Sequence, residues 1–359
     1  MKILFCDTLY GYGNSHVDDC MINILTRDNK VYLLRNDNLP TDLIENQSNL
    51  VVLKSKFKKR PKRLLLFRWE VLKGMMLASK YARQIKPDII IASTYRTSVF
   101  AFGFLLFKNR SKIVVVENNN IDQLESPTKR FFYNLFCNRV HHMVFESFFK
   151  DYLVKEIGVK EELIHVVPHI VYKKNIIETK KNRDINNVDC VAISGSNDLE
   201  TVRQILQIEQ TSHLLEKNKI RCKIKCKSLN YKSDFLEVNG DFIPKDEYER
   251  LYDNCKVVLI PFPISYKYRM SGCIVDAFSH HKPVVSSDLL LSNYYASKYG
   301  SIIRVGKNAE ELVNSIISLI KTPNDISDKG YTQFEIDHDE KEIGEKLNIM
   351  IVSVLDYSK

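Results

Sequence analysis

One segment of the sequence, Val257 to Asp288, combines residue types that can bind a diphosphate. An apolar strand is expected first, a loop with Lys267 and Arg269 follows, and Ser271 and Gly272 open a helix. The first turn of a helix presents free backbone N–H groups and a partial positive charge, and glycine lets a phosphate approach the backbone closely. This spacing predicts a diphosphate site at the start of the helix.

Asp276 lies four residues after Gly272, and therefore on the same helix face, one turn further on. A carboxylate at that position can accept hydrogen bonds from ribose hydroxyls while a diphosphate occupies the helix start. Spacing alone equally permits an ordinary strand–helix–strand connection in which Asp276 faces solvent. Both interpretations stay open on the residues alone.

The sequence around Asp276 resembles the donor-binding signature of retaining GT-B glycosyltransferases of the GT4 type. It reads Y-R-M-S-G-C-I-V-D-A-F-S-H-H-K-P-V-V-S-S-D, where that family has E-G-F-G-x-x-x-x-E-A-x-x-x-G-x-P-V-V-x-S-D. The resemblance implies that Asp276 holds the nucleotide ribose. It also implies that the backbone at Ser271 and Gly272 meets the diphosphate and the sugar.

The chain departs from the family pattern at Tyr268, which stands where the first Glu of the acidic pair belongs. Lys267 or Arg269 is expected to supply charge to the diphosphate in its place. The resemblance implies retention of the anomeric configuration, and the missing carboxylate leaves that expectation open.

Other segments are similar to the same family. The stretch from Asn239 to Glu247 looks like its G-x-[VI]-x-x-x-E loop, which would place Ile243 behind the nucleobase, and Val166 to Ile170 resembles its V-I-P-N-G run. Gly195 and Ser196 stand where the family has its turn after the first strand of the second domain. These residues complete the expected donor site.

Candidate catalytic residues in the first half follow two expected strands. Gly11 and Gly13 lie in a loop where the family keeps a glycine-rich turn near the donor phosphates, and a flexible turn is an equal alternative. His16 is a candidate catalytic or acceptor-orienting group, with a surface residue near a helix start as the alternative. Glu117 and Asn118 directly follow an apolar strand, where parallel sheets place their ligand crevice, although a plain loop of turn formers also fits.

Strands alternating with helices predict an α/β protein with two Rossmann-like, doubly wound parallel-sheet domains. The family resemblance implies that these domains form the GT-B arrangement. The expected boundaries are an acceptor domain at 1–172, a linker at 173–187, a sugar-nucleotide domain at 188–335 and a closing C-terminal helix at 336–359. The helix carries one apolar face, which is expected to pack on the first domain. That face is formed by Ile343, Leu347, Met350, Ile351 and Val354.

Composition fits a soluble two-domain chain. The 359 residues carry a net charge of +9, which favours an anionic partner such as a nucleotide, a phospholipid or a nucleic acid, and charge alone does not choose among these. Lys54 to Arg63 is basic and leads into Leu64 to Leu66, so it could contact an anionic membrane, although a solvated loop before a core helix is the plainer interpretation. Cys222 and Cys226 alternate with basic residues, which predicts a half-buried strand rather than a metal pair.

These patterns together predict a cytoplasmic glycosyltransferase, at the inner face of the membrane if the basic segment binds lipid. It would move a sugar from a nucleoside-diphosphate sugar to a glycan or lipid-linked acceptor, without a metal or another cofactor and without nucleic acid. The adjacent pair Asp18 and Asp19 is interpreted as a solvated helix face rather than a metal motif. A sugar-nucleotide epimerase or hydrolase, or a non-catalytic sugar-nucleotide-binding scaffold, are the alternatives.

Overall fold

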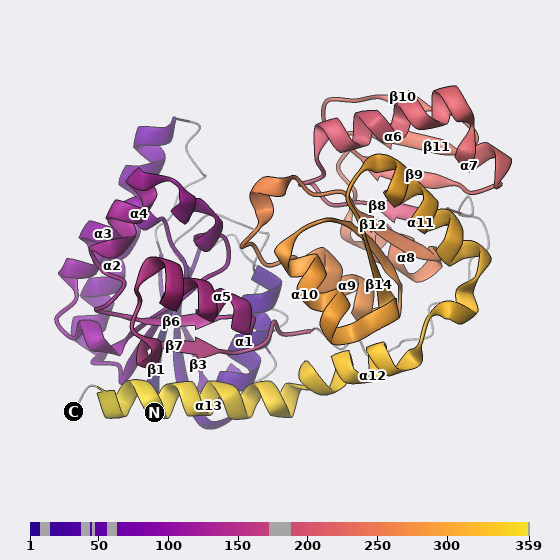
Figure 1. The fold of residues 1–359 in the computed structure, drawn as a ribbon. Coiled ribbons are helices and arrows are strands. Elements are labelled where there is room, and N and C mark those ends of the chain that lie inside the picture. Colours follow the sequence, from indigo (N-terminus) through magenta and orange to yellow (C-terminus); the bar gives the residue numbers. More distant parts are fainter. Residues whose placement is uncertain (8–14, 37–43, 45–46, 56–62, 172–187, 358–359) are drawn as a thin grey trace. The chain divides into compact units, whose positions relative to one another are not determined.

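The computed structural model describes residues 1–7, 15–36, 44, 47–55, 63–171 and 188–357. The chain divides into two compact units (Figure 1). Unit 1 comprises Met1–Tyr172 together with His338–Lys359, and unit 2 comprises Lys173–Asp337. The terminal segment therefore belongs to the unit formed by the first half of the chain.

Unit 1 is built on a parallel sheet with the strand order β3-β2-β1-β4-β5-β6-β7 within the described residues. Its strands are β1 (Lys2–Asp7), β2 (Lys30–Leu34), β3 (Leu50–Val52), β4 (Ile89–Thr94), β5 (Ile113–Val116), β6 (His141–Val144) and β7 (Ile164–Val166). Its helices are α1 (Ser15–Asp28), α2 (Leu64–Ile85), α3 (Thr97–Gly103), α4 (Pro127–Asn134), α5 (Ser147–Tyr152) and α13 (Glu340–Tyr357). Apolar strands buried on both faces are typical of such a sheet.

Unit 2 repeats this plan with the strand order β10-β11-β9-β8-β12-β13-β14. Its strands are β8 (Cys190–Ala192), β9 (Cys222–Lys225), β10 (Tyr231–Lys232), β11 (Leu236–Asn239), β12 (Val257–Ile260), β13 (Val284–Ser287) and β14 (Ile303–Gly306). Its helices are α6 (Leu199–Ser212), α7 (Leu214–Lys217), α8 (Lys245–Asn254), α9 (Gly272–Ser279), α10 (Leu290–Tyr299), α11 (Ala309–Lys321) and α12 (Asp328–Asp337). Only the short β10 runs antiparallel to its neighbour among the described strand pairs.

Several local predictions are confirmed. The apolar face of α13 is buried, and it packs within unit 1 against α1 and β4. Cys222 and Cys226 are buried core residues of unit 2, as the alternation on their strand indicates. The two-sheet α/β architecture is also as predicted. Strands and helices could be recognised because apolar residues repeat with periods of 2 and 3.6 residues within each segment.

Two predictions about burial are wrong. Asp18 and Asp19, interpreted as a solvated face, are only 3% and 4% exposed, because this face of α1 lies against the sheet of unit 1. Their burial is compensated, since Asp18 accepts a hydrogen bond from Ser93 at 2.9 Å and Asp19 pairs with Arg35 at 2.5 Å. Burial and the neighbouring carboxylates raise the pKa of Asp18 well above its ordinary value.

The second wrong prediction concerns the start of α2. Leu64, Leu65 and Leu66 were expected to pack in the core, but all three are exposed, Leu65 by 77%. The buried face of α2 instead begins at Phe67 and continues through Val71 and later residues. No helix within the described ranges is long and apolar enough to cross a membrane.

Candidate functional site

The candidate donor site lies where the strand order of unit 2 reverses. β8 sits between β9 and β12, so the loops after β8 and β12 leave the sheet side by side at the carboxyl ends of the strands. The Asp198 amide donates to the Pro261 carbonyl at 2.7 Å, which ties the two loops together. Ligands of open α/β sheets bind at such a switch point.

The loop after β8 holds Gly195 and Ser196. The Ser196 amide donates to the Ser194 hydroxyl at 3.2 Å, and the Asn197 side chain donates to the carbonyls of Ala192 and Lys225 at 2.7 and 3.0 Å. These bonds fix the turn, while Gly195 itself is exposed and a Cβ added there would meet no heavy atom within 4 Å. The structure thus leaves space in front of Gly195.

The loop after β12 ends at the start of α9. The Ser271 hydroxyl accepts a hydrogen bond from the Ile274 amide at 3.3 Å, so this side chain caps the helix. Gly272 is the first helical residue, and a Cβ there would again meet nothing within 4 Å. The remaining amides of the first turn have no intrahelical acceptor and suit an anion in this open space.

Asp276 lies one turn further along α9 and faces α8. Its Oδ2 accepts a hydrogen bond from the Tyr248 hydroxyl at 3.1 Å. Tyr252, one turn after Tyr248, donates its hydroxyl to the Cys273 carbonyl at 3.2 Å, and the two tyrosine rings lie 4.9 Å apart. The two tyrosines therefore hold α8 against α9 at the level of Asp276.

The protonation of Asp276 is poised in the weakly acidic range. Burial raises the pKa of Asp276 to about 6, and the Tyr248 hydrogen bond and His280 only partly oppose this rise. Above that pH the group is a half-buried carboxylate, which accepts hydrogen bonds strongly. The Asp276 carboxylate can therefore accept hydrogen bonds from the hydroxyl groups of a ribose.

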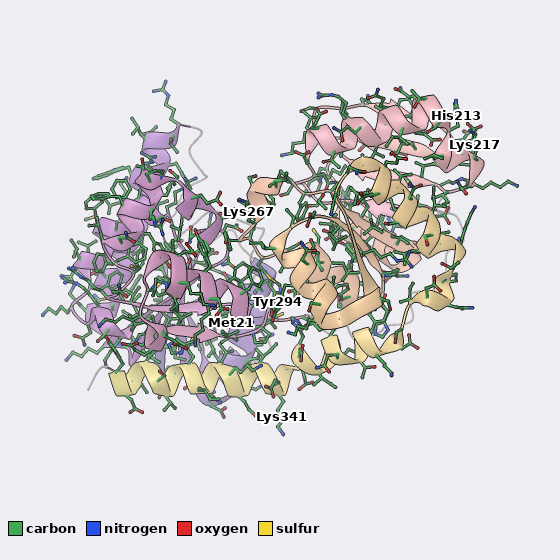
Figure 2. The ribbon with its side chains drawn as sticks, viewed as in Figure 1. Met21, His213, Lys217, Lys267, Tyr294 and Lys341 are labelled. Atoms are coloured by element: carbon green, nitrogen blue, oxygen red, sulfur yellow. The ribbon has the colours of Figure 1, made fainter. Side chains whose placement is uncertain are left out.

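The three residues Lys267, Tyr268 and Arg269 lie half-buried in the loop before α9. Arg269 stacks its guanidinium over the ring of Tyr266, 3.8 Å from the ring centroid. Figure 2 labels Lys267 on this loop, directly after the short helix at Ile264–Tyr266. The loop thus carries two cationic side chains between β12 and the open start of α9.

The expected nucleobase loop follows β11. Ile243 is half-buried in it, and Phe242 is 84% exposed with the Lys225 ammonium 5.8 Å from its ring centroid. Gly240 approaches another backbone segment so closely that an added Cβ would lie 2.7 Å from the Cα of Lys227. Glycine is required there because any side chain would push the loop off the end of β9.

In unit 1, Glu117 does not face a crevice. The side chain is fully buried, and its carboxylate accepts hydrogen bonds from Tyr95 at 2.8 Å and Tyr133 at 2.8 Å. His142 Nδ1 lies 2.8 Å from the same carboxylate, and His142 Nε2 lies 2.8 Å from the Cys137 carbonyl. Because a carbonyl only accepts, Nε2 must carry a proton, and the network is satisfied internally.

This burial revises the interpretation of Glu117 as a group that touches substrate, because no face of its carboxylate is left for one. Asn118 is half-buried and donates its amide to the Ser93 carbonyl at 2.8 Å, which joins the ends of β4 and β5. Both residues therefore hold the carboxyl edge of the sheet in shape. Gly11, Gly13 and the side chain of His16 lie outside the described residues, so their predicted roles stay predictions.

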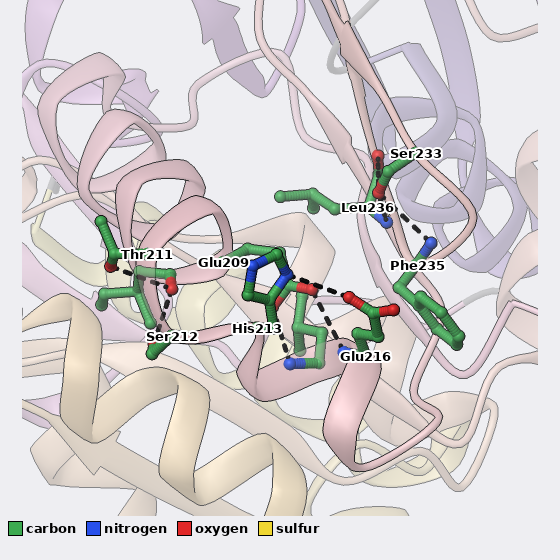
Figure 3. Close-up of polar contacts among 10 residues, drawn as sticks. Glu209, Thr211, Ser212, His213, Glu216, Ser233, Phe235 and Leu236 are labelled. Atoms are coloured by element: carbon green, nitrogen blue, oxygen red, sulfur yellow. Dashed lines mark hydrogen bonds and ion pairs between the residues drawn. The ribbon is translucent and has the colours of Figure 1, made fainter.

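One acid–histidine cluster resembles a metal site but has a structural explanation (Figure 3). Glu209, His213 and Glu216 bring possible ligand atoms within 4.8 Å of one another. However, the Glu209 carboxylate accepts the amides of Leu215 at 2.7 Å and Glu216 at 3.1 Å. Glu209 thus satisfies the free amides at the start of α7, and His213 and Glu216 form an exposed pair beside it.

Sequence reasoning missed Tyr248, which contacts Asp276 across 28 positions of the chain. The available signal was the spacing of Tyr248 and Tyr252, four residues apart on one helix face. Nothing in the sequence indicates that this face meets α9.

Comparisons with known proteins identify the fold. No family model and no curated protein matches the sequence. Among solved structures, Anabaena HepE in complex with UDP and glucose has a TM-score of 0.65 at 16% identity, over 98% of this chain and 100% of that one. Sucrose-phosphate synthase from Thermosynechococcus elongatus has a TM-score of 0.68 at 12% identity, over 97% of both chains.

A UDP-N-acetylglucosamine 2-epimerase from Rickettsia bellii is also similar, with a TM-score of 0.60 at 13% identity over 99% of this chain and 97% of that one. Glycosyltransferases and an epimerase thus share this architecture. The chain has the GT-B fold, as predicted, and the fold by itself does not select the reaction.

Proposed function

We propose that the protein is a glycosyltransferase that moves a sugar from a nucleoside-diphosphate sugar to a glycan or lipid-linked acceptor in surface polysaccharide or glycolipid assembly. The observation that carries this proposal is the pairing, at the switch point of unit 2, of the open helix start at Gly272 with the half-buried carboxylate of Asp276. The similar structures of Anabaena HepE in complex with UDP or UDP-glucose support it.

The same site suits departure of a nucleoside diphosphate. Negative charge grows on the diphosphate as its bond to the sugar breaks, and fixed dipoles and cations aimed at that charge lower the barrier. The amides at the start of α9, together with Lys267 and Arg269, supply this stabilisation in our proposal without a metal ion. Retention of the anomeric configuration is part of the proposal and rests on the resemblance around Asp276.

Membrane contact through the basic stretch from Lys54 to Arg63 belongs to the same proposal, because basic residues bind anionic lipid at roughly 1 kcal/mol each. It would bring the enzyme to a lipid-linked acceptor at the inner face of the membrane.

A sugar-nucleotide epimerase is the second candidate, because a 2-epimerase has the same fold. The two activities differ in their products, since a transferase moves the sugar to an acceptor and an epimerase releases an altered sugar nucleotide. NMR of the reaction mixture distinguishes them and also reports the anomer formed. A non-catalytic scaffold would bind the donor without turnover. The presence of Tyr268 in place of the first Glu of the acidic pair favours this alternative.

Thermal unfolding with a panel of sugar nucleotides and free nucleoside diphosphates, without added metal, tests the donor site. A ligand at about 100 times its Kd stabilises the unit that binds it by roughly 2.7 kcal/mol. We expect one sugar nucleotide to raise the transition of the wild type and to raise that of Asp276→Ala much less.

Asp253→Ala is the matched control. Asp253 is a carboxylate of α8 that contacts the other end of α9 through His280, at 2.8 Å, so its loss should leave the ligand shift unchanged. If no compound in the panel shifts the wild type, or if Asp276→Ala and Asp253→Ala respond alike, the proposed donor site is wrong.

A further inference from the structure

A groove in unit 1 has no role in the donor site described above. It has a volume of about 460 Å³, within the usual range for small-molecule sites, and it is lined by residues of α2, α3 and α4. These helices are neighbours in unit 1 (Figure 1). Its apolar walls include Leu65, Trp69, Leu72, Phe102 and Phe132.

The walls of the groove are unusually exposed for large apolar side chains. Trp69 is 52% exposed and Phe102 is 56% exposed, and Leu65 beside them is exposed still further. Contiguous apolar surface of this kind on a folded unit marks a place where an apolar ligand or partner binds. A hydrocarbon chain would remove this surface from water.

Cationic side chains meet at the same groove. Arg68 and Lys129 line it, and Arg96 is close enough that it and Arg68, after burial, lower the pKa of Lys129 from its ordinary value. Among the residues that the structure describes, neither Arg68 nor Lys129 forms an ion pair with an acidic group. An anion bound between them would relieve the repulsion of like charges.

The groove also lies on the ligand-binding side of unit 1. Arg96 lies two residues after the end of β4, and α4 follows the loop that leaves β5, so the first turns of α3 and α4 stand at the carboxyl ends of these strands. Parallel doubly wound sheets bind their ligands at that edge. A ligand in the groove would therefore reach the edge at which substrates are expected.

We propose that this groove binds a single anionic lipid, a phosphate or diphosphate ester of a linear hydrocarbon chain. Its chain lies against Trp69, Leu72 and Phe102, and its phosphate lies between Arg68 and Lys129. The role of this lipid as the sugar acceptor rests on the proposed function, whereas the binding itself does not. An apolar partner without charge would leave the cations unused.

Trp69 makes the binding directly observable, because it is the chain's single tryptophan. Dodecyl phosphate, titrated below its critical micelle concentration, is expected to shift the Trp69 emission to shorter wavelength and to saturate. Arg68→Ala and Lys129→Ala should each weaken this binding about tenfold, since each removes one charge-assisted contact. Lys80→Ala, an exposed lysine in the second half of α2, should leave it unchanged.

Two further probes separate the contribution of the phosphate group from that of the hydrocarbon chain. Inorganic phosphate alone and dodecyl maltoside, also below its critical micelle concentration, should each bind at least tenfold more weakly than dodecyl phosphate. Equal binding of the two dodecyl compounds, or indifference to Arg68→Ala and Lys129→Ala, would overturn the proposal. A Trp69 shift that appears only with anionic phospholipid vesicles would also overturn it, in favour of adsorption to a membrane surface.

The outcome is independent of the donor site. Failure of the sugar-nucleotide panel on unit 2 would remove the transferase proposal and leave the Trp69 titration interpretable. Conversely, a negative titration with normal donor binding would overturn the lipid groove alone.

Discussion

At the scale of single residues, the donor site depends on space in front of two glycines. Gly195 and Gly272 each have room for a Cβ, and neither has the positive φ that glycine alone tolerates well. Their lack of a side chain is therefore not needed for folding. A ligand that approaches the backbone closely would explain it.

Gly272→Ala tests this explanation. The unliganded protein should keep or slightly raise its Tm, because alanine in a helix is favoured over glycine by up to about 1 kcal/mol. Binding of the sugar nucleotide should weaken by about tenfold or more, because the new methyl group occupies the place of the phosphate. Calorimetric titration with the nucleotide that stabilises the wild type measures the affinity of the variant. An unchanged affinity would mean that the diphosphate binds elsewhere.

At the scale of elements, side chains cap the starts of some helices in unit 2, although α8 and α10 have no side-chain cap. Asp198 caps α6 and Asn308 caps α11 from the adjacent position. The start of α7 differs, because Glu209 reaches it from the preceding helix across the left-handed residue His213. The α6–α7 corner is thus held by one buried carboxylate.

Glu209→Ala should lower the stability of unit 2 by about 1–2 kcal/mol, because it leaves the Leu215 and Glu216 amides without their acceptor. For a unit of this size each kcal/mol corresponds to roughly 2–4 °C in Tm. Glu216→Ala, which removes only an exposed pair, should change the Tm little. Stabilisation by added Zn²⁺ that Glu216→Ala abolishes would instead favour a metal site.

At the scale of the whole molecule, the buried histidine pair of unit 1 and Asp276 of unit 2 contribute to stability with opposite dependences on pH. In unit 1, His141 Nδ1 lies 3.0 Å from His165 Nε2, and the terminal helix packs Tyr357 edge-on against His141. Burial lowers the pKa of His141 to about 3 and that of His165 to about 4. In unit 2, the pKa of Asp276 is raised instead.

Between about pH 4 and 6.5 the unfolded chain binds more protons at His141 and His165 than the folded chain does. The contribution of these two histidines to the stability of unit 1 should therefore be lost as the pH falls through this window, whereas the raised pKa of Asp18 acts in the opposite direction. The raised pKa of Asp276 has the opposite sign, so its contribution to unit 2 weakens as the pH rises from about 4 to 6. Scanning calorimetry across pH 4–7 should show that acidification lowers the transition temperature of unit 1 less in His165→Gln than in the wild type, because the variant lacks one of the two histidines. An equal slope in wild type and variant would contradict this.

The sequence by itself determined the features that depend on local periodicity. The half-buried strand at Cys222, the apolar face of α13 and the alternation of strands with helices are local patterns, so two doubly wound α/β units could be predicted from them. The GT-B assignment came from the family resemblance around Asp276. The helix start at Gly272 was predicted from the residues and the turn at Gly195 from the resemblance, but the structure supplied the strand order that places the two loops side by side.

Only the tertiary structure decided which polar and apolar side chains are buried. Asp18 and Glu117 are covered because Ser93, Tyr95 and Tyr133, distant in sequence, satisfy them. Leu65 is exposed because the core-facing stripe of α2 begins later. Burial of a side chain depends on which element packs against it. The apolar periodicity of one helix or strand does not show which element that is.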